Sequence, residues 1–164
     1  MTAIPACTIG LDGTLAVRWL GRAPGEPPSE NAVLHDLQAV VGGWVEPIDL
    51  TLTPDHAPIP VEATLWCNEE GLIVGLDTNE QATRLVRHCG AVWADTGIVG
   101  DVAITGPTDA DGETTGLSER ALRLIVEALT EEGGGPLRVA PTLWQYAAEQ
   151  VLAGIPTIVM DARP

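Results

Sequence analysis

The sequence VEATLWCNEEGLIVGL, residues 61–76, places two apolar runs on either side of the tetrapeptide NEEG. Asparagine is favoured at the first position of a type I turn and glycine at the fourth, so Asn68 to Gly71 predict the turn of a β-hairpin. An acid–base pair is the alternative interpretation of Glu69 and Glu70. Adjacent carboxylates on an exposed turn, however, lack the differing environments that such chemistry needs. We therefore interpret this stretch as two paired strands.

Further strands are predicted on both sides of this hairpin. Residues 6–20 contain two short apolar runs around Leu11-Asp12-Gly13, a sequence typical of a tight turn. Residues 44–52 alternate like a strand, and Pro47 favours an edge position or a bulge because it cannot donate a ladder hydrogen bond. Residues 97–106 are apolar almost throughout, which is typical of a central strand.

Two helices are predicted in the first half of the chain from their caps and their periodicity. The first follows Ser29 or Asn31, either of which suits an N-cap, and it ends at Gly42, a good residue for the left-handed position after a helix. The second begins after Asn79 as its N-cap and stops at Gly90.

The strongest helix signal lies between residues 117 and 132, where Ser118 suits the N-cap. Its apolar face is predicted to consist of Leu122, Ile125, Val126 and Leu129. A short strand at 137–140, a helix at 141–154 that starts at Pro141 or Thr142, and a last strand at 155–162 are also predicted. Together the pattern indicates an α+β fold, with a mainly antiparallel sheet built from hairpins and packed against three to four helices.

Length and composition favour one folded domain. The chain has 164 residues, which suits a single core, and 45% of them are hydrophobic. We therefore expect residues 1–164 to form a single domain. The three cysteines, Cys7, Cys67 and Cys89, are an odd number and widely spaced, so reduced thiols are expected.

The formal net charge is -15 at pH 7. Nucleic acids and anionic membranes attract Lys and Arg, so direct binding to either is not expected. A protein partner with a basic surface fits the charge, although an acidic surface also serves simply to keep a small protein soluble. The sequence shows no secretory signal and no apolar run of membrane-spanning length, so a cytoplasmic location is expected.

Motifs for metal binding and catalysis are missing from the sequence. Cys67, His88 and Cys89 lack the spacing of a metal site, and residues 108–113 hold only part of a calcium loop. Neither a G-x-S-x-G elbow nor a phosphate-binding glycine loop with its lysine occurs. We therefore expect no catalytic residue, no metal and no cofactor, with an unfamiliar enzymatic site as the remaining alternative.

Three segments in this order are similar to a known family: LQAVVGGWVEPIDL, LWCNEEGLIVGLDTNEQATRL and GIVGDVAITGPTDADGETTGL. They resemble small proteins of actinobacteria and their phages that are known only as a domain of unknown function. The pattern LQxxVGGxxE … NEEG … NxxAT … IVGD spans about residues 34–117, which leaves 118–164 as a C-terminal helical extension. It consists of Leu37, Gln38, Val41, Gly42, Gly43, Glu46, Trp66, Asn68, Glu69, Glu70, Gly71, Asn79, Ala82, Thr83 and residues 98–101. The resemblance implies a phage or mobile-element accessory protein without a settled activity.

Two hypotheses for function follow from these observations. The first is a protein without enzymatic turnover that binds a basic partner protein through an acidic surface and modulates a nucleic-acid enzyme. The alternative is a binder of a nucleotide or metabolite, in which tryptophan stacks on a ring and asparagine and threonine line a pocket. A homodimer through Trp144 and Tyr146 is a further hypothesis. The candidate binding surface consists of Gly42, Gly43, Trp44, Glu46, Trp66, Asn68, Glu69, Glu70, Asn79 and Thr83.

Overall fold

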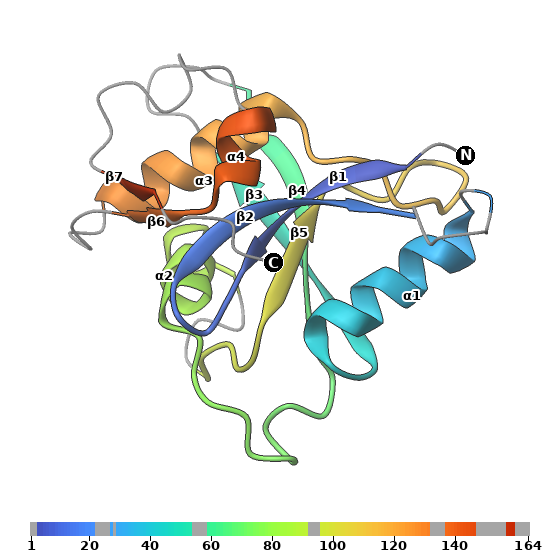
Figure 1. The fold of residues 1–164 in the computed structure, drawn as a ribbon, viewed down its shortest axis with the longest axis horizontal. Coiled ribbons are helices and arrows are strands. Elements are labelled where there is room, and N and C mark those ends of the chain that lie inside the picture. The colour runs from blue at the N-terminus through green and yellow to red at the C-terminus, as the bar shows by residue number, and fades with distance from the viewer. Residues whose placement is uncertain are drawn as a thin grey trace.

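The computed structural model describes residues 3–21, 27, 29–53, 59–91, 96–131, 137–146 and 157–159. These residues form an α+β fold in which helices cover a mainly antiparallel sheet (Figure 1), so the predicted fold class is confirmed. The strands are β1 (Ile4–Ile9), β2 (Thr14–Leu20), β3 (Val45–Leu52), β4 (Val61–Asn68), β5 (Val102–Thr105), β6 (Leu137–Val139) and β7 (Thr157–Val159). The helices are α1 (Glu30–Val41), α2 (Glu80–His88), α3 (Glu119–Glu131) and α4 (Pro141–Tyr146).

The described strands form one sheet in the order β3-β4-β5-β1-β2-β6-β7. Every pairing from β3 across to β2 is antiparallel, whereas β6 pairs in parallel with both β2 and β7. The predicted hairpin of β1 and β2 is present, and Gly13 has a φ of 84° in its turn. β3 occupies an end of the sheet, as Pro47 predicts, and β5 lies centrally between β4 and β1.

Successive side chains of a strand point to opposite sides, so both faces of the sheet carry apolar residues. Helices cover both faces. On one face α1 packs over a small core made of Ile4, Ala6, Leu20, Val33, Leu37 and Ala103. On the other face α2 and α3 pack over the main core, which includes Ile9, Leu15, Leu50, Leu65, Leu85, Ile104, Leu122 and Ile125. Leu143 of α4 joins this main core.

The helix caps are largely those predicted. Ser29 caps α1 by accepting a hydrogen bond from the Ala32 amide at 3.1 Å, and Gly42 ends this helix with a φ of 77°. Asn79 caps α2, and Ser118 accepts from the Ala121 amide at the start of α3 at 3.1 Å. The predicted apolar face of α3 is fully buried. Beyond α4 and β7, the predicted helix and strand of the C-terminal segment lie outside the described residues, as do the side chains of Trp144 and Tyr146.

The predicted hairpin over residues 61–76 is wrong. Its first half is the strand β4, but residues 69–75 form a succession of turns rather than a returning strand. β4 pairs instead with β3 and β5, which come from elsewhere in the chain. Because both edges of β4 are occupied, there is no free edge against which residues 72–76 could pair.

The predicted strand over residues 97–106 is shorter than expected. Only Val102–Thr105 form β5, and the preceding residues contribute a single bridge between Val99 and Thr78. Gly97 and Gly100 have φ angles of 76° and 77°. Since the extended strand conformation requires a negative φ, these two glycines explain why the strand starts late.

Candidate functional site

The loop between β4 and α2 is exposed to solvent, and Figure 1 shows it projecting away from the sheet. Its entry is an ordered turn: the Asn68 carbonyl accepts from the Gly71 amide at 3.1 Å, and the Asn68 side-chain oxygen accepts from the Glu70 amide at 2.9 Å. The Leu76 amide donates to the Gly71 carbonyl at 2.9 Å and closes the loop. These bonds give the loop a defined shape of its own.

The far end of this loop is apolar and exposed to solvent. Leu72, Ile73 and Val74 have exposed fractions of 65%, 86% and 60%, and we call these three residues the apolar tip. Trp44, at the same end of the sheet, is 65% exposed, and its carbonyl accepts a hydrogen bond of 2.8 Å from the Glu69 amide. Single exposed apolar residues are common, but three in succession on a projecting loop usually serve an interaction.

Carboxylates flank the apolar tip along the chain. Glu69 and Glu70 directly precede it, Asp77 follows it closely, and all three side chains are exposed. Glu46 lies on β3, where it pairs with Cys67, one residue from the start of the turn. We call Glu46, Glu69, Glu70 and Asp77 the acidic rim.

A pocket of about 250 Å³ lies next to the loop. Ile48, Leu72 and Ile98 contribute apolar side chains to its wall, while Glu46 and Glu69 contribute carboxylates. It is lined by Glu46, Ile48, Cys67, Asn68, Glu69, Leu72, Thr96, Gly97, Ile98 and Val99. The pocket therefore combines an apolar wall with negative charge.

Gly71 lets the loop lie close to residues 97–100. A Cβ at this position would lie 2.7 Å from Cγ2 of Val99 and 3.3 Å from the Asn68 carbonyl oxygen. Its φ is not positive, so the requirement for glycine is one of space rather than of backbone conformation. Gly71, the glycine of NEEG, thus allows the loop to pack against the wall of the pocket.

The predicted surface residues do not all lie at one exposed site. Trp44, Glu46, Asn68, Glu69 and Glu70 lie together at the end of the sheet that carries the loop. Asn79 and Thr83 are buried, with exposed fractions of 1% and 3%, so their side chains serve the interior.

The buried polar residues hold segments of the fold together. The Asn79 side-chain amide donates to the Ile9 and Gly100 carbonyls at 3.0 and 2.9 Å, while its oxygen accepts from the Ala82 amide. The Thr83 hydroxyl accepts from the Ile98 amide at 2.9 Å. These bonds join the start of α2 to β1 and to the segment before β5.

Trp66, Gly42 and Gly43 also have structural partners. The Trp66 indole N–H donates to the Thr105 hydroxyl at 2.9 Å, and the half-buried ring packs on the small core beneath α1. Gly42 occupies the left-handed position that ends α1, while a Cβ on Gly43 would lie 2.9 Å from the Asn68 side-chain nitrogen. That nitrogen donates to the Val41 carbonyl at 3.1 Å, so the VGG and NEEG motifs meet in one contact.

The cysteines are unsuited to nucleophilic chemistry. All three are free thiols; burial raises the pKa of Cys7 to about 12 and that of Cys89 to about 11. Burial also raises the pKa of Cys67 to about 11, with a further contribution from the negative charge of Glu46. A thiol with such a pKa stays protonated at neutral pH, and the thiolate is the reactive form.

A thiol-labelling experiment checks this environment. At pH 8 we expect the native protein to react with a disulfide reagent at least about tenfold more slowly than the unfolded chain, because each thiol is more than ten times less ionised than a free cysteine. Absorbance of the released thiolate measures the rate in buffer and in denaturant. One cysteine that reacts natively at the unfolded rate would contradict the buried environment.

Within the described part of the chain, no group of three or more His, Cys, Asp or Glu side chains is arranged to hold a metal ion. None of the described helices combines the length and apolar character needed to cross a membrane.

The sequence pattern predicts a strand for Leu72 to Val74 and so misses the apolar tip. The available signal was the run of aliphatic residues ending in Gly75, which has a φ of 77°.

Comparisons with known proteins identify a family for this chain. A family model with the description Domain of unknown function (DUF3846) matches residues 17–130, from within β2 to the last turn of α3. No curated protein and no solved structure matches the chain. The matched range extends beyond residues 34–117 at both ends, and it contains the apolar tip, the acidic rim and the pocket beside them.

Proposed function

Because the chain belongs to the DUF3846 family, whose description assigns no activity, we propose a function from its own surface: it binds a basic segment of a partner protein. The apolar tip and the acidic rim form the contact, and no catalytic turnover is involved. The observation that carries the proposal is the run Leu72-Ile73-Val74, exposed at 65%, 86% and 60%.

The apolar tip supplies the binding energy in this proposal. Burial of apolar surface contributes about 25 cal/mol per Å² removed from water, and the tip already holds its shape through its own hydrogen bonds. An ordered loop loses little conformational entropy on binding. Trp44 adds a large aromatic surface at the same end of the sheet, and tryptophan is enriched among residues that dominate binding energy.

The acidic rim selects the partner. Glu69 and Glu70 precede the tip and Asp77 follows it, so a partner segment that covers the tip meets negative charge on both sides of it. The net charge of -15 extends this preference over long distances and speeds association with a basic surface. The same charge repels anionic lipid headgroups, which argues against insertion of the tip into a membrane.

The pocket beside the tip fits an arginine or lysine side chain of that partner. Long basic side chains cover apolar surface with their methylene groups and keep the charged group on polar partners. Ile48, Leu72 and Ile98 offer the apolar wall, and Glu46 and Glu69 offer the carboxylates. A pocket of about 250 Å³ is large enough for one such side chain, which would act as an anchor.

The proposal includes a cellular role. The resemblance to phage-associated proteins supports a role as an accessory protein, and basic protein surfaces commonly bind nucleic acid. A phage or mobile-element protein that covers such a surface would modulate a nucleic-acid enzyme of the host.

The test compares three forms of the full chain as bait in a bacterial lysate: wild type, Ile73→Asp and Ile59→Asp. Ile59 is 66% exposed and lies outside the tip, so Ile59→Asp is a matched control. We expect Ile73→Asp to weaken capture of a specific partner by about tenfold or more, because a charge at the centre of an apolar contact is left desolvated. Quantitative mass spectrometry of the bound proteins measures the change.

Two further conditions, high salt and vesicles of anionic phospholipid, test the role of charge in this binding. Raising the salt to about 0.5 M shortens the Debye length to about 4 Å and should release a partner held by the acidic rim. Vesicles of anionic phospholipid should not retain the protein. Equal capture by Ile73→Asp and wild type would exclude the tip as the contact, and flotation with the vesicles would favour a membrane surface instead.

A further inference from the structure

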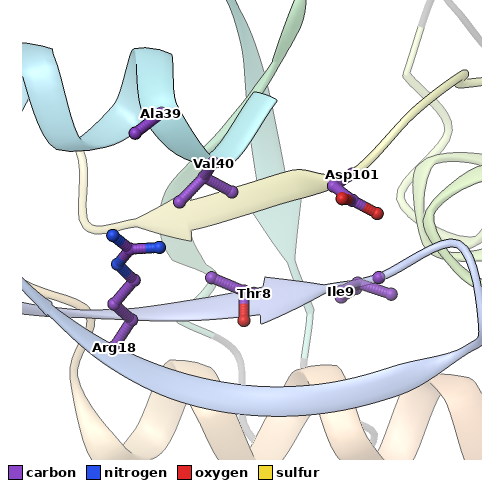
Figure 2. Close-up of a pocket in the computed structure, with 7 residues that line it drawn as sticks. Thr8, Ile9, Arg18, Ala39, Val40 and Asp101 are labelled. Carbon is purple, nitrogen blue, oxygen red and sulfur yellow. The ribbon is translucent and has the colours of Figure 1, made fainter. Parts of the chain in front are cut away.

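A second pocket, of about 290 Å³, lies away from the apolar tip. Figure 2 shows it between the C-terminal half of α1 and the strands β1, β2 and β5. It is lined by Thr8, Ile9, Gly10, Arg18, Ala39, Val40 and Asp101. Ala39 and Val40 form an apolar side from α1, and none of these seven residues lines the pocket beside the tip.

The pocket carries one positive and one negative side chain. Arg18 is exposed on β2, and no carboxylate of the described residues lies within ion-pair distance of it. Asp101 is also exposed, and one of its carboxylate oxygens accepts a hydrogen bond of 2.9 Å from the Leu11 amide, which fixes the group beside the β1–β2 turn. Thr8, whose side chain is visible between them in Figure 2, provides a hydroxyl group.

Strand register sets the separation of the two charges. Arg18 is the cross-strand partner of Ala6, whereas Val102 is the partner of Ile9, so Asp101 lies level with Gly10. The two backbone positions are thus four residues apart along β1, or about 13 Å at about 3.3 Å per residue, and two strand spacings of about 4.8 Å add to this because β2 and β5 flank β1 on opposite sides. A guanidinium and a carboxylate held at opposite ends of one pocket do not neutralise each other and remain available to a ligand.

We propose that this pocket binds a small zwitterion, with its carboxylate against Arg18 and its ammonium group against Asp101. Arginine presents a planar fork of donors that matches a carboxylate, and an ammonium group donates to an aspartate. The methylene chain between the two ligand charges would lie along Val40 and Ala39. The volume suits a metabolite of amino-acid size and is below the usual range for a nucleotide or a drug-sized ligand.

The overall charge of the protein strengthens this assignment. With a net charge of -15, a dianion would be repelled over long distances before it reached Arg18. A purely cationic ligand would meet Arg18 in the pocket. A zwitterion avoids both penalties, and the spacing favours one whose two charges are several bonds apart, such as ε-aminohexanoate or δ-aminopentanoate.

The probes are ε-aminohexanoate and δ-aminopentanoate, with hexanoate and hexylamine as analogues of the first that each lack one charge. Amide chemical shifts of the full chain report binding, and the Gly10 and Leu11 amides are the sensors because they adjoin Asp101. We expect a saturable shift with the zwitterions and binding weaker by about tenfold or more with either analogue, since each analogue loses one charge-assisted contact.

Variants assign the contacts. Arg18→Gln and Asp101→Asn should each weaken binding by about tenfold or more, and both side chains are exposed, so the fold is retained. Arg138→Gln and Asp111→Asn make the same charge changes at exposed positions outside the pocket and should bind like wild type. Lack of a saturable shift with ε-aminohexanoate and with δ-aminopentanoate, or equal affinity of the two pocket variants and wild type, would overturn the proposal. Ile73→Asp should leave this binding unchanged, which separates it from partner binding at the tip.

Discussion

Asn79→Ala is expected to lower the free energy of unfolding by about 3–7 kcal/mol. The substitution removes the N-cap of α2, which costs about 1 kcal/mol, and it leaves the Ile9 and Gly100 carbonyls without their donor at about 1–3 kcal/mol each. Asn79 is 1% exposed, so water cannot replace the lost amide without entering the core.

Urea unfolding followed by tryptophan fluorescence measures this change, with two variants for comparison. Ser118→Ala removes the N-cap of α3 at an exposed position and should cost only about 1 kcal/mol. Asn79→Ser keeps a capping oxygen but not the two long-range bonds, so its stability should fall between that of wild type and that of Asn79→Ala. If Asn79→Ala costs no more than Ser118→Ala, the bonds to Ile9 and Gly100 contribute no net stability.

Local elements of the fold could be predicted because their signals lie within a few residues. Ser29, Asn79 and Ser118 cap helices by bonds to amides three residues ahead, and the capping preference is visible in any such sequence. The β1–β2 hairpin is equally local, since its turn requires the positive φ of Gly13.

The error over residues 61–76 has a physical cause. The turn at Asn68 to Gly71 is present, as NEEG predicts, but a turn does not determine whether the chain after it finds a strand to pair with. That outcome depends on β3 and β5, which occupy the two edges of β4. Sheet order is a non-local property, and hydrophobic pattern alone does not encode it.

The candidate site could be predicted only in part for a related reason. The motif residues meet in space through structural bonds such as that from Asn68 to the Val41 carbonyl. A polar residue in a motif can serve the fold or the surface, and only burial distinguishes the two roles. Asn79 and Thr83 serve the fold, whereas Glu69, Glu70 and Trp44 remain exposed beside the apolar tip. The exposure of Leu72 to Val74 follows from the missing strand partner, so it could not be predicted before the topology.

Residues 118–164, interpreted from the sequence as an extension beyond the family-like core, begin with a helix that contributes to the main core. Ala121, Leu122, Ile125, Val126 and Leu129 of α3 are fully buried in the main core. The family model continues to residue 130, almost to the end of this helix. A helix that supplies so much of a core cannot be removed without exposing the sheet beneath it.

Ile125→Ala is therefore expected to destabilise the whole domain by about 2–5 kcal/mol, the usual cost of emptying a buried isoleucine site. A dispensable extension would behave differently, because its loss of packing would leave the unfolding of residues 34–117 unchanged. Urea unfolding reports the difference, with Arg123→Ala as the control on the same helix. Arg123 is exposed and pairs only with Glu127, four residues ahead, at 3.1 Å among the described residues, so its removal should cost no more than about 0.5 kcal/mol. One cooperative transition, shifted to lower urea by Ile125→Ala, makes α3 part of a single domain. Two transitions, of which only the minor one shifts, would instead show that residues 118–164 unfold separately, as an extension.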